Sequence, residues 1–123
     1  MIEMDSPLPV LAITMGDGAG IGPEIVVKAL SRPEVRALCR PVVIGDVMTL
    51  YQSLQFVRES ERPRILPVTS VADIDWGADV TIPVLQAGDA LRNVKPGELS
   101  AEAGRGAVAY VLAAGMLAAP LVW

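Results

Sequence analysis

The residues most able to do chemistry lie in one glycine-rich stretch, ITMGDGAGIGPE, at positions 13–24. Its four glycines, at positions 16, 18, 20 and 22, follow an apolar run and precede Pro23 and Glu24. Backbone amides in such a bend, next to the start of a helix, suit an anion or a ribose edge. The alternative is that the glycines only form a tight turn between strand and helix. Because Asp17 and a helix N-terminus converge on the same bend, we favour a binding function.

Two familiar phosphate-binding loops do not match this stretch. A dinucleotide fingerprint needs G-x-G-x-x-G between strand and helix. The sixth position of this motif must be glycine, but it is Ile21 when the motif is counted from Gly16 and Pro23 when it is counted from Gly18. Asp46 follows the next apolar run, where a ribose-binding acid would stand, but the first half of the motif fails. A P-loop is excluded because no G-K-[ST] follows the glycines.

The composition excludes several other kinds of site. With no histidine, the chain cannot build a His-containing zinc site or a Ser-His-Asp triad by itself. Its single cysteine, Cys39, cannot form an internal disulfide or a thiolate cage, and we expect it to be a small buried hydrophobe. We therefore assign no catalytic residue and no metal ligand within this chain.

Charge and hydropathy exclude two kinds of partner. The net charge is −4, and Arg32, Arg36 and Arg40 are expected to form a solvated helix face rather than a nucleic-acid patch. No apolar run reaches the roughly 18 residues that a bilayer span needs. The N-terminus carries acidic residues where a signal peptide has basic ones. We expect a cytoplasmic protein with no nucleic-acid or membrane partner.

Apolar runs alternate with helical patterns along the 123 residues, which suffice for one domain with a core. We predict strands at 9–15, 41–46, 64–68 and 79–85, of which the first two are buried on both faces. Pro67 places the third near a sheet edge, because proline donates no ladder hydrogen bond. The predicted helices cover 23–31, 34–40, 47–59 and, after a Ser100 cap, 101 to about 118. This order predicts an α/β domain of layered helices and sheet.

The last predicted helix is crowded with alanine and glycine. An interior glycine costs roughly 1 kcal/mol relative to alanine, so we expect close approach of another element to offset that cost. Tyr110, Val111, Met116 and Leu117 supply the larger side chains. An apolar ending, Pro120–Trp123, follows the helix without a capping charge and predicts that the chain is an incomplete piece of a larger protein.

Three blocks of the sequence carry a resemblance to a known family. AITMGDGAGIGPEIVVKAL, PVVIGD and GELSAEAGRGAVAYV resemble, in order and spacing, the N-terminal part of the 4-hydroxythreonine-4-phosphate dehydrogenase family of pyridoxal phosphate (pyridoxine) biosynthesis. GDGAGIGPE is also similar to the GDGIGPE loop of isopropylmalate and isocitrate dehydrogenases, whose fold that family shares. The resemblance implies that residues 1–123 are the N-terminal portion of a helix-sheet-helix dehydrogenase domain, without a classical Rossmann site and with the second domain absent.

The resemblance also implies a reaction. It is NAD- or NADP-dependent oxidation of a secondary alcohol, with metal-assisted decarboxylation, in a homodimer. The substrate would be 4-phosphohydroxy-L-threonine or a related small phosphorylated hydroxy acid, and the metal zinc, magnesium or cobalt. The chain has Gly18 where the family has proline, which leaves the subfamily open. Relatives that act on threonate or erythronate phosphates, or on cis-dihydrodiols, are the alternatives.

Only two groups of residues can be carried over from the family. Ser100, Glu102 and Gly104 match its LSAEAG block, which we interpret first as helix capping and packing and second as cleft lining. The loop that faces the interdomain cleft near the nicotinamide cofactor is matched by Asp17, Gly18, Ala19, Gly20 and Ile21.

The family's metal-binding histidines and phosphate-gripping residues have no counterpart in this chain. We therefore expect neither cofactor to bind tightly to the chain alone, and no dehydrogenase activity from it alone. The alternative function is non-catalytic: a truncated half-domain whose alanine-rich helix could pair with another copy.

Overall fold

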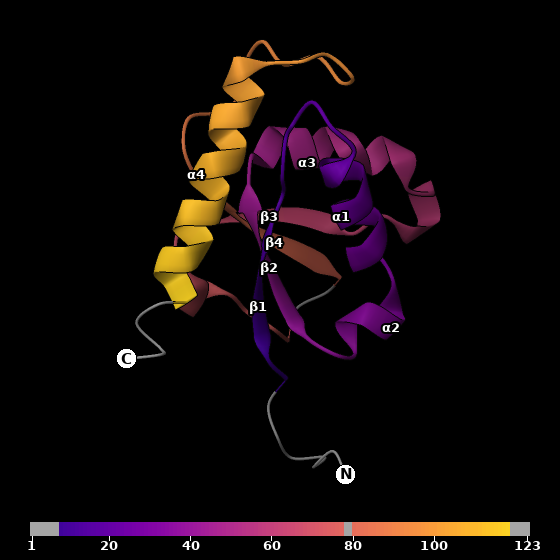
Figure 1. The fold of residues 1–123 in the computed structure, drawn as a ribbon. Coiled ribbons are helices and arrows are strands. Elements are labelled where there is room, and N and C mark those ends of the chain that lie inside the picture. The colour runs from indigo at the N-terminus through magenta and orange to yellow at the C-terminus, as the bar shows by residue number, and fades with distance from the viewer. Residues whose placement is uncertain (1–7, 78–79, 119–123) are drawn as a thin grey trace.

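Four parallel strands form the centre of the computed structural model, which describes residues 8–77 and 80–118 (Figure 1). The strand order is β1-β2-β4-β3. The strands are β1 (Val10–Thr14), β2 (Arg40–Gly45), β3 (Arg64–Val68) and β4 (Thr81–Gln86). The predicted α/β class with a parallel sheet is confirmed. Pro67 lies in β3, which is an edge strand as predicted.

Helices cover both faces of this sheet. Figure 1 shows α4 on one face, and α1 and α3 on the other. The helices are α1 (Gly22–Leu30), α2 (Pro33–Arg36), α3 (Val47–Ser53) and α4 (Ala101–Ala118). Short 3₁₀ turns occupy Leu54–Phe56, Glu59–Glu61 and Val71–Asp73. The result is a helix, sheet, helix arrangement in which the carboxyl ends of the strands share one edge.

The core lies around the two central strands. Val42, Val43 and Ile44 of β2 and Ile82 and Val84 of β4 are at most 1% exposed. Such continuous burial is typical of parallel strands with helices on both faces. Pro83 of β4 lies opposite Leu66 of β3, and the pairing of β2 with β4 begins at the following residue, with Val43 opposite Val84. Cys39 is buried and free, as predicted.

Two predictions about the elements are wrong. The predicted 47–59 helix ends at Ser53, where the chain tightens into a 3₁₀ turn. The predicted helix at 34–40 shortens to Pro33–Arg36, because β2 already begins at Arg40. Asp79, in the predicted fourth strand, and the ending at 119–123 lie outside the described residues.

The first strand lies where it is predicted, but its predicted burial on both faces is wrong, and the larger side chains of the last helix differ in their exposure. β1 has the predicted position, but Val10 and Leu11 are 47% and 45% exposed, because β1 is an edge strand paired to β2 alone among the described residues. Tyr110 of α4 is fully buried, whereas Val111 and Met116 are 60% and 76% exposed.

Candidate functional site

The glycine-rich loop leaves the carboxyl end of β1 as a compact turn held by Asp17. The Asp17 carboxylate accepts a hydrogen bond from the Ala19 amide at 2.7 Å, and its carbonyl accepts one from the Gly20 amide at 3.0 Å. Two of the amides that could have served an anion are therefore used within the turn. The turn itself explains two of the four glycines. Gly16 has φ +80°, and a Cβ on Gly22 would collide with the Met15 carbonyl oxygen.

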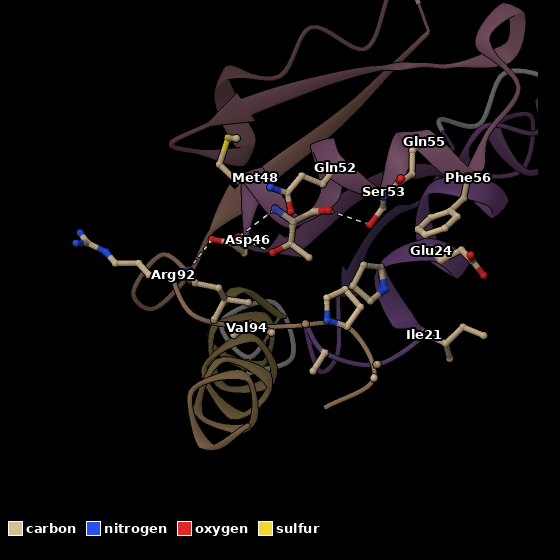
Figure 2. A pocket seen from close by; sticks show the side chains of 18 residues that line it. Ile21, Glu24, Asp46, Met48, Gln52, Ser53, Gln55, Phe56, Arg92 and Val94 are labelled. Carbon is tan, nitrogen blue, oxygen red and sulfur yellow. Dashed lines mark hydrogen bonds between the residues drawn. The ribbon is translucent and has the colours of Figure 1, made fainter. Parts of the chain in front are cut away.

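The outer side of this loop forms one wall of a pocket of about 550 Å³ at the carboxyl edge of the sheet (Figure 2). Residues on α3, among them Met48 and Gln52, form a second wall, and the segment 91–97 forms a third. Of the five residues matched to the cofactor loop, four line the pocket: Gly18, Ala19, Gly20 and Ile21. Asp17 is not among the lining residues, because its carboxylate is turned into the loop.

The pocket is lined mainly by neutral groups. Gln52 and Gln55 contribute side-chain amides, whereas Ile21, Met48 and Phe56 contribute apolar surface and are each at least half exposed. In Figure 2 the Arg92 side chain extends away from the other labelled residues. Such a lining suits an uncharged, partly apolar portion of a ligand better than a phosphate group, which proteins bind with cations or convergent amides.

Asp46 lies at the floor of the pocket and is 1% exposed. One carboxylate oxygen caps α3, because it accepts hydrogen bonds from the amide and the hydroxyl of Thr49 at 3.1 and 2.7 Å. The other oxygen accepts from Gln86 Nε2 at 3.0 Å and from the Leu91 amide at 3.3 Å. Four donors thus occupy the carboxylate, so that Asp46 is a structural junction and not the ribose-binding acid that its position suggested.

The third wall, residues 91–97, is tied to α4 and to the glycine loop. Glu102 accepts hydrogen bonds from the amides of Arg92 and Asn93 at 3.0 and 3.3 Å, and these bonds lower the pKa of its carboxyl. The Gly97 amide donates to the Ala19 carbonyl at 2.7 Å. The Ser100 hydroxyl accepts from the Ala103 amide at 3.1 Å. The capping and packing interpretation of the LSAEAG block is therefore confirmed for Ser100 and Glu102.

A buried tyrosine lies behind this wall. Tyr110 is 0% exposed, and its hydroxyl has no hydrogen-bond partner among the described residues. Burial, with the nearby carboxylates of Asp46 and Asp17, raises the pKa of Tyr110 to about 12. The Leu91 side chain lies between the loop and α4, because a Cβ on Gly18 would collide with it and a Cβ on Gly106 would come within 3.4 Å of it. The glycine content of this helix predicted close approach of another element, and the Leu91 side chain approaches the helix closely at Gly106.

The wall residues on α3 and the partners of Asp46 were not predicted as site residues. Asp46 followed three residues later by Thr49 is an N-cap pattern that could have identified the helix start. Gln86 and Leu91 give no such signal, since they lie 40 and 45 positions along the chain from Asp46.

Neither a metal centre nor a membrane span is found in the part of the chain that the structure describes. Residues 8–77 and 80–118 contain no group of three or more histidine, cysteine, aspartate or glutamate residues able to hold a metal ion. Among the helices of the same residues, none is both long and apolar enough to span a bilayer.

Comparisons with known proteins agree on one family. The chain is 45% identical over 115 residues to D-threonate 4-phosphate dehydrogenase of Bordetella bronchiseptica, a match that covers 92% of this chain and 32% of that protein. It is 39% identical over 105 residues to 4-hydroxythreonine-4-phosphate dehydrogenase of Trichlorobacter lovleyi, over 81% of this chain and 30% of that protein. No protein-family model matches the chain.

A solved structure supports the same likeness. The crystal structure of a 4-hydroxythreonine-4-phosphate dehydrogenase from Burkholderia phymatum has a TM-score of 0.84 and 37% identity to this chain, over 94% of this chain and 34% of that one. The chain therefore spans about a third of the length of its relatives. The predicted resemblance is confirmed: over that third, in sequence and in fold, this chain is similar to proteins of the 4-hydroxythreonine-4-phosphate dehydrogenase family, consistent with an N-terminal part.

Proposed function

We propose that this chain supplies one wall of the active-site cleft of an NAD-dependent dehydrogenase that oxidises a 4-phosphorylated hydroxy acid. The observation that carries the proposal is 45% identity to a D-threonate 4-phosphate dehydrogenase across nearly the whole chain. Identity is lower, at 39%, to a relative named for 4-hydroxythreonine 4-phosphate. We therefore take D-threonate 4-phosphate as the first substrate to test and 4-hydroxythreonine 4-phosphate, with its link to pyridoxine biosynthesis, as the second.

The proposed cleft belongs to an isocitrate dehydrogenase-like, cytoplasmic homodimer, and the loop at Gly18–Ile21 lies against the nicotinamide cofactor. NAD or NADP, when bound, would accept the hydride. The loop acts through shape, since the Ala19 and Gly20 amides already donate to Asp17. The neutral pocket wall fits the nicotinamide or a ribose, and the pyrophosphate must be held elsewhere. Asp46 and Glu102 position the walls of the pocket without touching the reacting atoms.

The implied divalent metal does not fit the residues of this chain. Histidine is absent from the sequence, and the described residues contain no carboxylate and thiol cluster with three members. Because a zinc, magnesium or cobalt ion needs several such ligands, its ligands must come from polypeptide outside this chain. We therefore derive no step of the reaction through the metal.

A chimera tests the proposed function. It joins this chain to the remaining two-thirds of the Bordetella bronchiseptica relative, and NAD reduction is followed with each phosphorylated substrate, with and without a chelator. We expect turnover by the chimera, preferring D-threonate 4-phosphate, and none by the chain alone. A folded chimera that is inactive with both substrates would contradict the proposal. Activity of the chain alone would contradict the need for the second part.

A matched pair of substitutions tests the cofactor wall within that chimera. Ile21 lines the pocket and is 65% exposed, whereas Ile25 lies one turn further along α1, is 53% exposed and does not line it. We expect Ile21→Glu to raise the KM for NAD by about tenfold or more, which is 1.4 kcal/mol or more of binding energy, because it places a charge against the cofactor. Ile25→Glu should leave that KM unchanged. Equal effects of the two substitutions on the KM for NAD would contradict the proposal that the loop contacts the cofactor.

The second candidate function, a half-domain that associates with another copy, is favoured by one observation. Val108, Val111, Leu112 and Met116 of α4 are each at least 60% exposed. Sedimentation of the chain over a range of concentrations tests this function. A self-associating half-domain should form dimers as the concentration rises. Under the first proposed function, in which the chain is one part of a dehydrogenase, the chain alone should stay monomeric.

A further inference from the structure

A second cavity, of about 650 Å³, lies at the edge of the sheet opposite the candidate functional site. It is bounded by the end of α1 and the start of α2, by the segment 56–62, and by Val80. Because Arg62 and Val80 come shortly before β3 and β4, they lie where these parallel strands begin. We call this cavity the amino-edge pocket.

Basic side chains are concentrated in the amino-edge pocket. Four of the chain's ten lysine and arginine residues line it, against two of its fourteen aspartate and glutamate residues. The chain as a whole has a net charge of −4, so this cavity is a positively charged region of an acidic protein. The basic residues are Lys28, Arg32, Arg58 and Arg62, and the acidic ones are Glu34 and Glu61.

The fold itself explains only some of these cations. Lys28 lies in the last turn of α1, where positive charge stabilises a helix, and it pairs with Glu24 at 3.6 Å. Arg32 follows the same helix end. Arg58 and Arg62 come from a different segment and line the same cavity. Bringing like charges together costs free energy, so this convergence is better explained by an anion that binds between the two segments.

The contacts of the arginines leave them able to bind an anion. Arg32 pairs with Glu34 at 3.5 Å, but the two side chains are 70% and 67% exposed, and such exposed pairs contribute little to stability. Nε of Arg62 donates to the Val57 carbonyl at 2.9 Å, which orients the guanidinium, and its two terminal nitrogens are further donors. Arginine binds phosphate oxygens through charge-assisted, often bidentate hydrogen bonds. A phosphate group therefore suits this side of the cavity.

The amino-edge pocket also has an apolar wall. Phe56 and Val80 line it and are 50% and 49% exposed, and Pro33 and Val57 add further apolar surface. Small-molecule sites are typically cavities of roughly 300–1,000 Å³ that combine apolar walls with a few polar groups. An inorganic anion would contact only the cationic side, whereas an organic phosphate would contact both.

We propose that the amino-edge pocket is a second ligand site, which binds a small phosphorylated organic molecule with an apolar or aromatic portion. Arg32, Arg58 and Arg62 hold its phosphate group. Phe56 and Val80 contact its apolar portion. A nucleic acid is not favoured, because the acidic remainder of the chain repels a long polyanion. The proposal does not depend on the proposed function, which concerns the pocket at the carboxyl edge of the sheet.

Three probes test the two halves of this site: inorganic phosphate, phenyl phosphate and phenol. Their binding to the chain is measured by calorimetric titration. We expect phenyl phosphate to bind at least about tenfold more tightly than inorganic phosphate, because it also buries a ring. Phenol should show no saturable binding, and higher ionic strength should weaken the binding of both phosphates. Equal affinities for the two phosphates would overturn the proposal.

A matched pair of substitutions tests the role of the arginines. Arg58→Gln removes a charge from the amino-edge pocket, whereas Arg105→Gln removes an exposed charge from α4, which Figure 1 shows across the sheet from α1 and α2. We expect Arg58→Gln to weaken the binding of phenyl phosphate at least about fivefold, and Arg105→Gln to leave it unchanged. Equal effects would show that the probe responds only to net charge, and would overturn the proposal.

Amide chemical shifts of the wild-type chain locate the probe without any substitution. On addition of phenyl phosphate, we expect the largest changes at residues 28–34 and 57–62. Phe56 is left out of this comparison because it lines both pockets. Largest changes at residues 18–21 and 91–97 would place the probe in the pocket at the carboxyl edge, and would overturn the proposal. If phenyl phosphate binds at the amino edge but the chimera reduces no NAD, this proposal stands and only the proposed reaction fails.

Discussion

Asp46 and Gln86 join the carboxyl ends of the two central strands through a pair of hydrogen bonds. Nε2 of Gln86 donates to Asp46 at 3.0 Å, and Oε1 of Gln86 accepts from the amide of Val47, the residue after Asp46, at 2.9 Å. The same carboxylate caps α3 and accepts from the Leu91 amide. This junction fixes the floor and two walls of the pocket relative to one another.

Asp46→Ala is therefore expected to lower the free energy of unfolding by about 3 kcal/mol, from a lost helix cap and from buried donors left without an acceptor. Urea unfolding followed by circular dichroism measures the change. Asp75→Ala is the control, because Asp75 makes one exposed hydrogen bond, to the Gly77 amide. It should cost less than about 1 kcal/mol. Equal costs for the two variants would show that the junction does not stabilise the fold.

The glycine-rich loop gives a second prediction, which distinguishes a glycine that close packing requires from a glycine that has room for a side chain. A Cβ on Gly22 would collide with the Met15 carbonyl oxygen, which is backbone and cannot move aside, whereas a Cβ on Gly20 would lie 3.5 Å from its nearest neighbour. Gly22→Ala should destabilise the chain by about 2 kcal/mol or more, since the loop must shift. Gly20→Ala should change stability by less than about 1 kcal/mol. Thermal unfolding of both variants checks this, and a Gly22→Ala variant as stable as Gly20→Ala contradicts the stated packing.

Much of the fold could be predicted because it is encoded locally. The run Pro41–Ile44 is apolar enough to specify a buried strand, and Ser100 followed by alanine specifies the start of α4. The early end of α3 could not be predicted, because Leu54 continues a helical spacing that the chain abandons for a 3₁₀ turn. The exposure of Val10 could not be predicted either, since burial of an edge strand depends on what lies beside it.

The site was predicted less well, for a different reason. Residues 17–21 were identified through the resemblance to the family's loop, and of these, residues 18–21 line the pocket. Asp46 was noticed because it directly follows a predicted strand. Its role, however, depends on hydrogen bonds from Gln86 and Leu91, which come close to Asp46 only once the sheet has formed. Contacts over such separations leave no periodic or spacing signal in a single sequence.

Tyr110 gives a third prediction. Its buried hydroxyl has no partner among the described residues, and an unsatisfied buried polar group costs free energy. Tyr110→Phe should therefore raise the free energy of unfolding by about 1 kcal/mol. Tyr110→Leu, which also changes the shape of the side chain, is the comparison and should destabilise the core. A Tyr110→Phe variant less stable than the wild type would show that the hydroxyl is hydrogen-bonded in solution.

The same tyrosine predicts a loss of stability in alkali. The folded pKa of Tyr110 is raised from the ordinary 10.0 to about 12, so that between these values the unfolded chain gives up its proton first. Stability from this group is complete below pH 10 and is lost as the pH rises toward 12, by at most about 1.4 kcal/mol per unit. Tyr110→Phe should lack this contribution. Parallel stability curves of wild type and variant over that range would contradict it.

Glu102 predicts the opposite behaviour in acid. The amides of Arg92 and Asn93 lower the pKa of its carboxyl below the ordinary 4.5, so that the unfolded chain takes up a proton before the folded one does. The stability due to Glu102 is therefore present above pH 4.5 and is lost as the pH falls through the folded pKa. In Glu102→Gln this pH-dependent contribution is removed, so its difference from wild type should shrink as the pH falls. Glu98→Gln, which removes a carboxylate four positions earlier in the chain, is the control and should follow the wild type. A constant difference between Glu102→Gln and wild type from neutral pH to pH 3 would show that the carboxylate does not hold residues 92 and 93 through its charge.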